Sequence, residues 1–554
     1  MKKTTNEPVS VPAGTQITPK LLVSRQRNNG FEKVSRIFAF LMITVFPLFI
    51  MNITNKLNDE GKFILYSVGN FWYYNITQVK ITSFRVITLT YIIVCVLLLC
   101  TFLWNKKAAK SRLLDNSFKL TLPQKLMIAY LIWVIFTAFF AKDYEFNVLW
   151  LGFRAEHASV GIRTEGIYHA LLYGFIFVLL SYFGEYTENY MRGMGVMAGI
   201  FGFVCVLQSF GVNLLYPEET NYWGSQFLGT VGNIDCIGGI CAMVIPALFC
   251  GYVLIEDKWR YACLPGLVLM TYTMLFCDVD SGKMGLIAAF LVTMPFLLEN
   301  RKRIIDTLQC GAVFSATAAV CYMLNVTYGG KINFNFGKKV LLFLAVAVLA
   351  AAGSYVLSRK KEPLKFSPAK MRRTVAIVIA GIVLAALLFL FIFDIGDRGV
   401  LHDMHDVLHG NLTDNAGSNH GYTWKVCFKL MFGSFKNAIV GTGPGTFYYE
   451  YWPHIRNNTA FDLAHNEFLQ IGVHSGIIGL ALYIAFVASV AVRAVKAAPR
   501  CPMVIILASA FAGYLAHSFF SFSIAIVTPI FWVLTGLLDK CIRQMPPENK
   551  EDAE

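Results

Sequence analysis

The sequence predicts an all-α polytopic membrane protein with about 12–14 transmembrane helices and one long external loop between late spans. Three observations lead to this fold class. Hydrophobic residues make up 56% of the 554 residues and charged residues only 15%, whereas a soluble protein carries about a quarter charged residues. Apolar segments long enough to cross a bilayer recur along the chain. The basic residues cluster between these segments in a regular alternation.

About fourteen apolar segments mark the expected spans. They cover residues 34–53, 84–104, 124–141, 166–183, 194–212, 237–255, 262–277, 284–298, 304–323, 339–357, 374–393, 468–492, 502–521 and 524–538. Many others follow the first segment, so we interpret it as a span and not as a cleaved signal peptide.

Basic residues give the orientation of these spans. If the spans alternate, the clusters before residue 37 and at 106–112, 301–303, 359–373 and 493–500 all fall on one side. The positive-inside rule makes that side the cytoplasm, so both termini are expected inside a bacterial cytoplasmic (inner) membrane. Cytoplasmic loops also account for the formal charge of +14, and no nucleic-acid partner is implied.

The same alternation divides the chain into five regions. We expect a disordered cytoplasmic N-terminus at 1–33, a transmembrane bundle with short external loops at 34–393, a long external loop at 394–467, C-terminal transmembrane helices at 468–540 and a cytoplasmic tail at 541–554. An external loop of this length is usually functional.

Polar residues gather in the external loops. The stretch 152–174 contains Arg163 and Glu165 just before a span, and it is either a membrane anchor or an anion site. In 224–239, Asn233 and Asp235 either cap the next helix or belong to a re-entrant loop.

The short segment 277–285 places Asp278, Asp280 and Lys283 beside the membrane. Charges in such places usually pair, and they are candidates for function by default. Here the pairing is equally well explained as structural.

The strongest signal is "GTGPGTFYYEYWPHIRNNTAFDLAHNEFLQIGVHSGIIGL", residues 441–480. Gly441, Gly443 and Gly445 predict a turn, and without a following Gly-Lys-Ser/Thr it is not a nucleotide-binding loop. Asp462 is the expected N-cap of a helix that starts near Leu463.

That helix start would be an anion site. His465 and Asn466 would occupy the first turn, where free N–H groups and the helix dipole attract negative charge. Asn466, Gln470 and His474 would form one polar stripe on an apolar helix, with Glu467 beside it. The alternative is a histidine that only packs.

Two further patterns lie in the long loop. Residues 418–431 predict an amphipathic helix that lies on the outer surface or packs in the loop. His402, His405 and His409 have a spacing that permits a metal site, but no H-E-x-x-H motif is present and we expect no metal or cofactor.

Four segments resemble one family. "NAIVGTGPGTF" (437–447) followed by "AHNEFLQIGVHSGIIGL" (464–480) resembles the signature of the O-antigen ligase/polymerase family of bacterial membrane glycosyltransferases. "RTEGIYHALLYG" (163–174) and "GTVGNIDCIGGICAMVIPAL" (229–248) resemble two further family segments in the expected order. The resemblance covers roughly residues 140–490.

The resemblance implies a GT-C-like fold and a metal-independent, inverting transfer. The donor would be a glycan linked to undecaprenyl diphosphate, and a glycan, lipid or protein would be the acceptor. It also implies that membrane lipids surround the protein, that the active site lies on the external (periplasmic) face and that His465 is the catalytic residue.

The chain departs from the family at its arginines. His420 stands where an arginine is usual before the tryptophan helix, Gln226 stands in another arginine position, and His474 replaces a usual glutamate. Arg163, Lys283, Lys425 and Arg456, with Asn466, are the candidate substitutes for diphosphate binding. A different anionic group on the donor and an inactive relative are the alternatives.

The expected function is therefore O-antigen ligase-like glycan transfer. A repeat-unit polymerase of the same family is the first alternative. A transporter or flippase of lipid-linked sugars is the alternative from another class, and it predicts broken helices and charges in mid-membrane.

Overall fold

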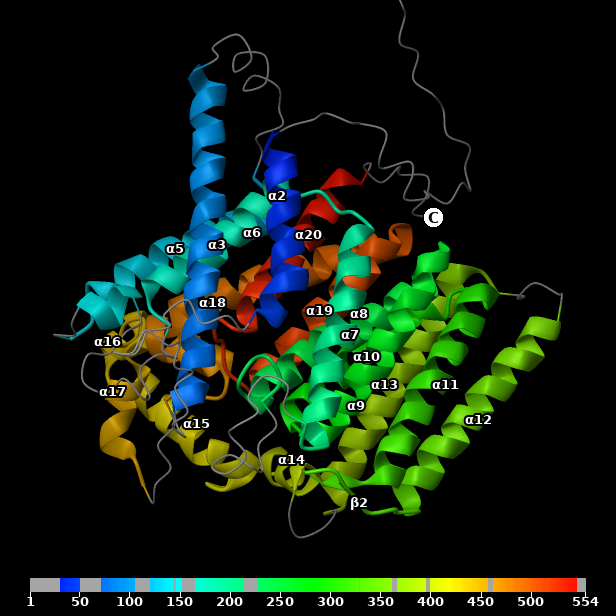
Figure 1. The fold of residues 1–554 in the computed structure, drawn as a ribbon. Coiled ribbons are helices and arrows are strands. Elements are labelled where there is room, and N and C mark those ends of the chain that lie inside the picture. The colour runs from blue at the N-terminus through cyan, green and yellow to red at the C-terminus, as the bar shows by residue number, and fades with distance from the viewer. Residues whose placement is uncertain are drawn as a thin grey trace, which may run out of the picture.

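The computed structural model describes residues 30–49, 71–104, 120–142, 146–151, 165–212, 228–327, 329–360, 366–394, 399–456 and 462–545. The described chain is almost entirely helical (Figure 1). Its two short strands, β1 (Val326–Thr327) and β2 (Lys331–Ile332), pair antiparallel as one hairpin. The predicted all-α class is confirmed.

The helices follow one another along the chain with short connections. In the first half they are α2 (Gly30–Phe40) with its continuations η1 (Leu41–Val45) and η2 (Phe46–Leu48), α3 (Phe71–Trp104), α5 (Leu122–Ala138), η4 (Asn147–Leu151), α6 (Ile167–Phe183), α7 (Asn189–Ser209), α8 (Ile234–Leu254), η6 (Lys258–Ala262) and α9 (Cys263–Cys277). In the second half they are α10 (Asp280–Leu297), α11 (Arg301–Leu324), α12 (Lys338–Arg359), α13 (Pro368–Ile392), α14 (Val400–Leu408), α15 (Ala416–Phe432), α16 (Phe435–Val440), α17 (Phe447–Tyr451), η7 (Trp452–His454), α18 (Glu467–Ala497), η8 (Ala498–Arg500), α19 (Pro502–Phe519) and α20 (Thr528–Gln544).

Each of the fourteen apolar segments expected from the sequence overlaps a helix. Among the described residues, 10 helices are long and apolar enough to cross a membrane, and α5 and α6 are shorter apolar helices. The chain is therefore a multi-pass membrane protein, as predicted. Asn233, one of the two expected caps, is the N-cap of α8, because its side chain accepts hydrogen bonds from the N–H groups of Asp235 and Cys236.

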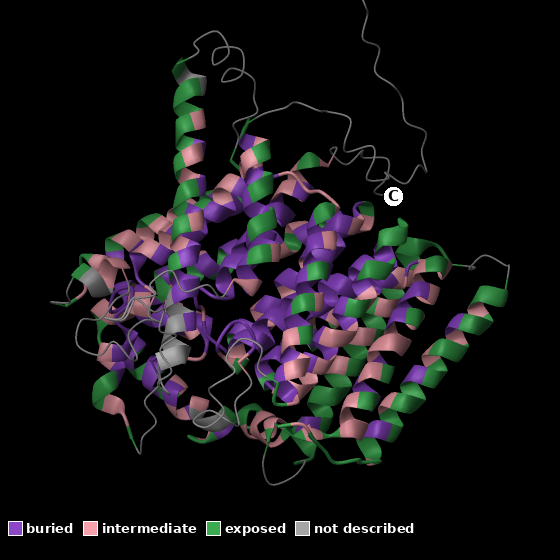
Figure 2. Cartoon of the chain, viewed as in Figure 1, coloured by how far each residue is buried: buried purple, intermediate pink, exposed green. Residues whose placement is uncertain are grey.

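The core of the bundle surrounds α8. Every residue of α8 from Cys236 to Leu254 is buried, and the helix packs against α9, α10 and α19. By contrast, α13 has a single buried residue, Leu390, and its apolar side chains lie at the surface with those of α12 (Figure 2). This distribution is typical of a bundle whose outer helices face lipid.

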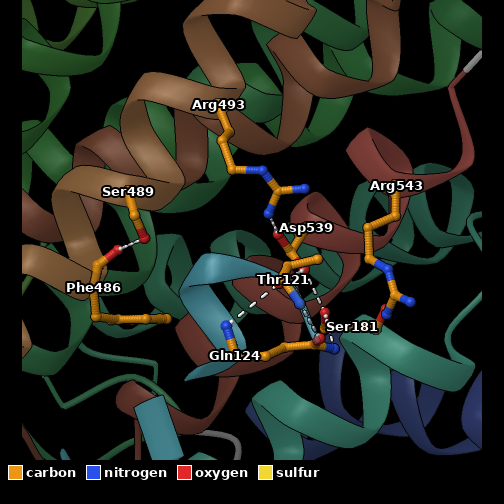
Figure 3. A network of polar contacts seen from close by, with 8 residues as sticks. All are labelled: Thr121, Gln124, Ser181, Phe486, Ser489, Arg493, Asp539 and Arg543. Carbon is orange, nitrogen blue, oxygen red and sulfur yellow. Dashed lines mark hydrogen bonds and ion pairs between the residues drawn. The ribbon is translucent and has the colours of Figure 1, made fainter. Parts of the chain in front are cut away.

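A polar network ties four helices together at one end of the bundle (Figure 3). Asp539 on α20 is buried, and it accepts hydrogen bonds from Arg493 on α18, from Ser181 on α6 and from Thr121, the N-cap of α5. Gln124 donates to the same Ser181 hydroxyl at 2.9 Å. Intramembrane charges are expensive unless they are paired in this way.

The segment predicted as the long external loop contains helices of its own. In the described part of 394–467 these are α14, α15, α16, α17 and η7. α14 and α15 lie at the same end of the bundle as the β1–β2 hairpin (Figure 1). The predicted amphipathic segment 418–431 is helical and forms most of α15.

Candidate functional site

The glycine turn rests on a break in α18. Gly476 has φ +65° inside α18, so the helix kinks there and the carbonyl groups of the preceding turn lack their usual partners. The N–H groups of Thr442 and Gly443 bind the oxygens of Val473 and His474 at 2.8 and 3.0 Å. Because these contacts bring two backbones together, the turn needs residues without a side chain.

Glycine meets that need in the turn. Gly441, Gly443 and Gly445 all have positive φ, and a Cβ on Gly441 would lie 2.5 Å from the carbonyl carbon of His474. The three predicted turn residues therefore hold the loop against α18 and do not cradle a ligand.

The start of α18 differs from the expected one. We expected Asp462 to cap a helix that begins near Leu463, but α18 begins at Glu467 and its N-cap is Asn466. The Asn466 side chain accepts a hydrogen bond from Leu469 N at 2.9 Å. Its oxygen is therefore committed to the helix, since an N-cap side chain replaces a missing helical partner.

His465 adopts an unusual backbone conformation directly before this cap. Its φ is +49°, in the left-handed region that non-glycine residues rarely adopt. The segment is fixed because Gln470 accepts a hydrogen bond from Ala464 N at 3.1 Å. Such strain persists only where the surroundings impose it, and it is concentrated at functional sites.

Two aromatic side chains surround the His465 ring. The imidazole of His420, on α15, lies with its centroid 4.6 Å away, and the ring of Phe522 lies 4.9 Å away. Trp424, one helical turn after His420, contacts Phe519 and Phe520 at the end of α19. The external helix α15 is thereby packed over the start of α18.

The two histidines of this pair have different surroundings. Burial lowers the pKa of His420 to about 4, so its imidazole is neutral near pH 7. A neutral imidazole accepts a hydrogen bond or a proton on one ring nitrogen. The position that carries an arginine in the resembled family is therefore uncharged here.

Below the histidine pair lie two carboxyl groups joined by hydroxyl groups. Glu467 accepts hydrogen bonds from Tyr483 at 2.7 Å and from Tyr514 at 3.1 Å. Glu165 accepts hydrogen bonds from Tyr173 at 2.5 Å and from Ser523 at 2.9 Å. Thr528 joins the two sets, since its hydroxyl lies 2.8 Å from that of Tyr514 and 3.1 Å from that of Ser523.

These carboxyl groups line a cavity of about 80 Å³. Its walls come from α5, α6, the glycine turn, α18 and α20, and they include Tyr130, Glu165, Pro444, Glu467, Gln470 and His474. The cavity adjoins the histidine pair through the chain, because Glu467 follows two residues after His465 and Ser523 follows Phe522. The sequence stripe of Gln470 and His474 therefore faces this cavity.

The predicted diphosphate-binding cations are not gathered into one clamp. Lys283 binds Asp278 and Asp280 at 2.5 and 2.9 Å, within its own segment. Lys425 binds Asp414 at 2.7 Å on the exposed side of α15.

Arg456 and Arg163 complete the set. The guanidinium of Arg456 lies 5.2 Å from the ring centroid of Tyr422, which is also on α15. Arg163 lies outside the described residues. Lys425 and Arg456 are thus associated with α15, the helix that also carries His420.

The histidines of α14 have separate partners. Nδ1 of His402 lies 2.8 Å from Asp394, Nδ1 of His405 lies 2.7 Å from Leu390 O, and Nδ1 of His409 lies 2.9 Å from His405 O. Their spacing is accounted for by the packing of α14 against α13 and by contacts within α14.

Several residues of the site carried no signal in the sequence. Tyr483, Tyr514, Ser523 and Thr528 look like ordinary members of apolar spans, and only the fold brings their hydroxyl groups to the two carboxyl groups. His420 was noticeable only as a departure from the resembled family.

No protein-family model matches the chain, and no curated protein matches its sequence significantly. The resemblance to O-antigen ligases therefore rests on the short motifs.

Proposed function

We propose that the protein is a glycosyltransferase of the O-antigen ligase type. It moves a glycan from an undecaprenyl-diphosphate donor to an acceptor hydroxyl at the external face of a bacterial cytoplasmic membrane. The observation that carries the proposal is the constrained His465, which stands with a positive φ at the start of α18 and in ring contact with His420.

The reaction asks two things of the site. The acceptor hydroxyl is a weak nucleophile, and a histidine within reach of its proton acts as the general base. The leaving diphosphate gains charge, which basic side chains and N–H groups neutralise. In this proposal His465 takes the first role or binds the diphosphate, and no metal takes part.

The ion pairs of the candidate cations rank them for the second role. Lys283 already faces two carboxylates, so an anion must displace both of them. The pair of Lys425 with Asp414 is exposed, and exposed pairs contribute less than about 1 kcal/mol. Lys425 and Arg456 are therefore the better candidates, with Arg163 as a third.

A polymerase uses the same donor and differs only in its acceptor. It remains the first alternative, because the described geometry bears on the donor side of the reaction. The buried carboxyl groups and the kinked α18 are features that a transporter also has, and they favour it as the alternative from another class.

Reconstitution separates the three functions. Purified protein in proteoliposomes is given an undecaprenyl-diphosphate-linked oligosaccharide and a lipid or glycan acceptor. A ligase yields one product of fixed size, and a polymerase yields a ladder of longer glycans. Movement of the donor between leaflets with no new glycosidic bond would identify a transporter and contradict the proposal.

A further inference from the structure

The hydroxyl chain between Glu165 and Glu467 lacks one proton. Tyr514, Thr528 and Ser523 connect the two carboxyl groups through four contacts of 3.1, 2.8, 3.1 and 2.9 Å. Each contact needs one proton between its two oxygens, and each hydroxyl supplies only one. Three hydroxyl protons cannot fill four contacts, so the fourth proton must come from a carboxyl group.

The cavity beside this chain contains two polar atoms without partners. Nε1 of Trp532 and Nε2 of His474 are shielded from bulk solvent and have no hydrogen-bond partner, and both residues line the cavity. Trp532 is only 4% exposed, and its indole N–H can only donate. A buried donor left unsatisfied costs about 1–3 kcal/mol, so the cavity calls for a ligand with acceptor oxygens.

Water fits this cavity. Its volume is about 80 Å³, and one water needs on the order of 15 Å³ measured in this way. A few water molecules therefore have room to satisfy Trp532 and His474 while they also reach the carboxyl groups.

The surrounding charges favour a neutral form of one carboxyl. The groups that face the pair are Tyr130 from α5, Tyr173 from α6, His474 and Tyr483 from α18, and Tyr514 from α19. A cation acts from α3, where Arg85 donates hydrogen bonds to His169 and to Leu151 O. Burial nevertheless raises the pKa of Glu165 to about 7, because it outweighs the attraction of Arg85 and the hydrogen bonds from Tyr173 and Ser523.

We infer that Glu165 and Glu467 hold one proton between them and that the cavity is a proton-binding and proton-exchange site. The proton leaves one carboxyl toward its hydroxyl neighbour, each hydroxyl passes its own proton on, and the last one reaches the other carboxyl. No atom or charge is lost in this exchange. The inference does not depend on the proposed glycan transfer.

Infrared spectroscopy of the purified full-length protein tests the inference. Wild type near pH 7 should show the carbonyl stretch of one protonated carboxyl, which disappears on alkaline titration. Glu165→Gln should lose all of this absorption, because the amide N–H supplies the missing proton and lets Glu467 ionise. Glu467→Gln should do the same, and Glu256→Gln, at an exposed carboxyl, should change nothing.

Three results would overturn the inference. Wild type without protonated-carboxyl absorption near pH 7 would mean that both groups are ionised. Loss of only half of the absorption in each glutamine variant would mean two independent protons. Loss of the wild-type absorption on adding sodium ions at constant pH would mean that the site takes a cation instead. The first and third results need only wild-type protein, so they do not depend on the folding of the variants.

Discussion

The imidazole of His420 lies against the imidazole of His465, with the ring centroids 4.6 Å apart. One residue belongs to the external helix α15, and the other precedes the long helix α18. The contact packs the external segment onto the membrane bundle and gives the candidate site a lid built from the same chain.

Acid should loosen this contact through His420. Its folded pKa of about 4 lies below the ordinary 6.5, so the unfolded chain binds more protons between these values and stability falls as pH decreases from 6.5 toward 4. The loss relative to neutral pH is at most about 3 kcal/mol. Thermal unfolding in detergent across this range measures it.

His420→Phe keeps a ring but cannot titrate, so this part of the pH dependence should vanish in the variant. His409→Phe, at an exposed position, is the matched control and should behave as wild type. Equal slopes for wild type and His420→Phe would contradict the assigned role.

Gly476→Ala should destabilise the protein. Gly476 has φ +65°, and a Cβ there would lie 2.7 Å from Val440 N, so both the backbone and the packing oppose a side chain. We expect a loss of roughly 2–3 kcal/mol in the free energy of unfolding. Gly381→Ala is the control, because a Cβ at Gly381 meets nothing within 4 Å and alanine favours a helix. Comparable melting temperatures for the two variants would refute the importance of the kink.

Asp539→Asn should cost much more than the loss of an exposed ion pair. Asp539 is buried and holds Arg493, Ser181 and Thr121 together (Figure 3). Removing one partner of a buried pair costs about 3–5 kcal/mol, since the other charge is left without compensation. Lys302→Ala breaks the exposed pair with Glu256 and should cost less than about 1 kcal/mol. Unfolding by heat or denaturant should separate the two variants clearly.

Much of the fold was predictable because hydropathy acts locally. Fourteen apolar segments became helices, and Asn233 caps α8 as its position suggested. The start of α18 was misplaced because Asp462 and Asn466 are both good cap residues, and only the contact of Gln470 with Ala464 fixes the loop between them. The break at Gly476 could not be foreseen, since its cause is the distant glycine turn that binds the freed carbonyl groups.

Less of the candidate site was predictable. The motif around His465 drew attention to the start of α18, and its polar stripe does face a cavity. The partners of Glu467 are Tyr483 and Tyr514, and those of Glu165 include Ser523, which is far away in the sequence. Such pairs carry no local pattern, so they follow only from the packing of α6, α18, α19 and α20.

Under the proposed function, Lys425→Ala should weaken donor binding. The exposed partner Asp414 gives way easily to a diphosphate, whose contact with a cation contributes about 1.5–3 kcal/mol. We therefore expect the KM for the donor to rise roughly 10–100-fold while kcat changes little. Lys283→Ala should leave this KM within a few-fold of wild type, because Lys283 is occupied by Asp278 and Asp280. The reverse order of the two KM values would contradict this ranking.

The central claim is that His465 carries glycan transfer, and one measurement tests it most directly. Purified His465→Ala and wild-type protein, matched in folding by melting temperature, are given the same undecaprenyl-diphosphate-linked donor and acceptor, with His409→Ala as control. We expect His465→Ala to lose about 10²–10⁴-fold in transfer rate and His409→Ala to retain full activity. Full activity of folded His465→Ala would contradict the account.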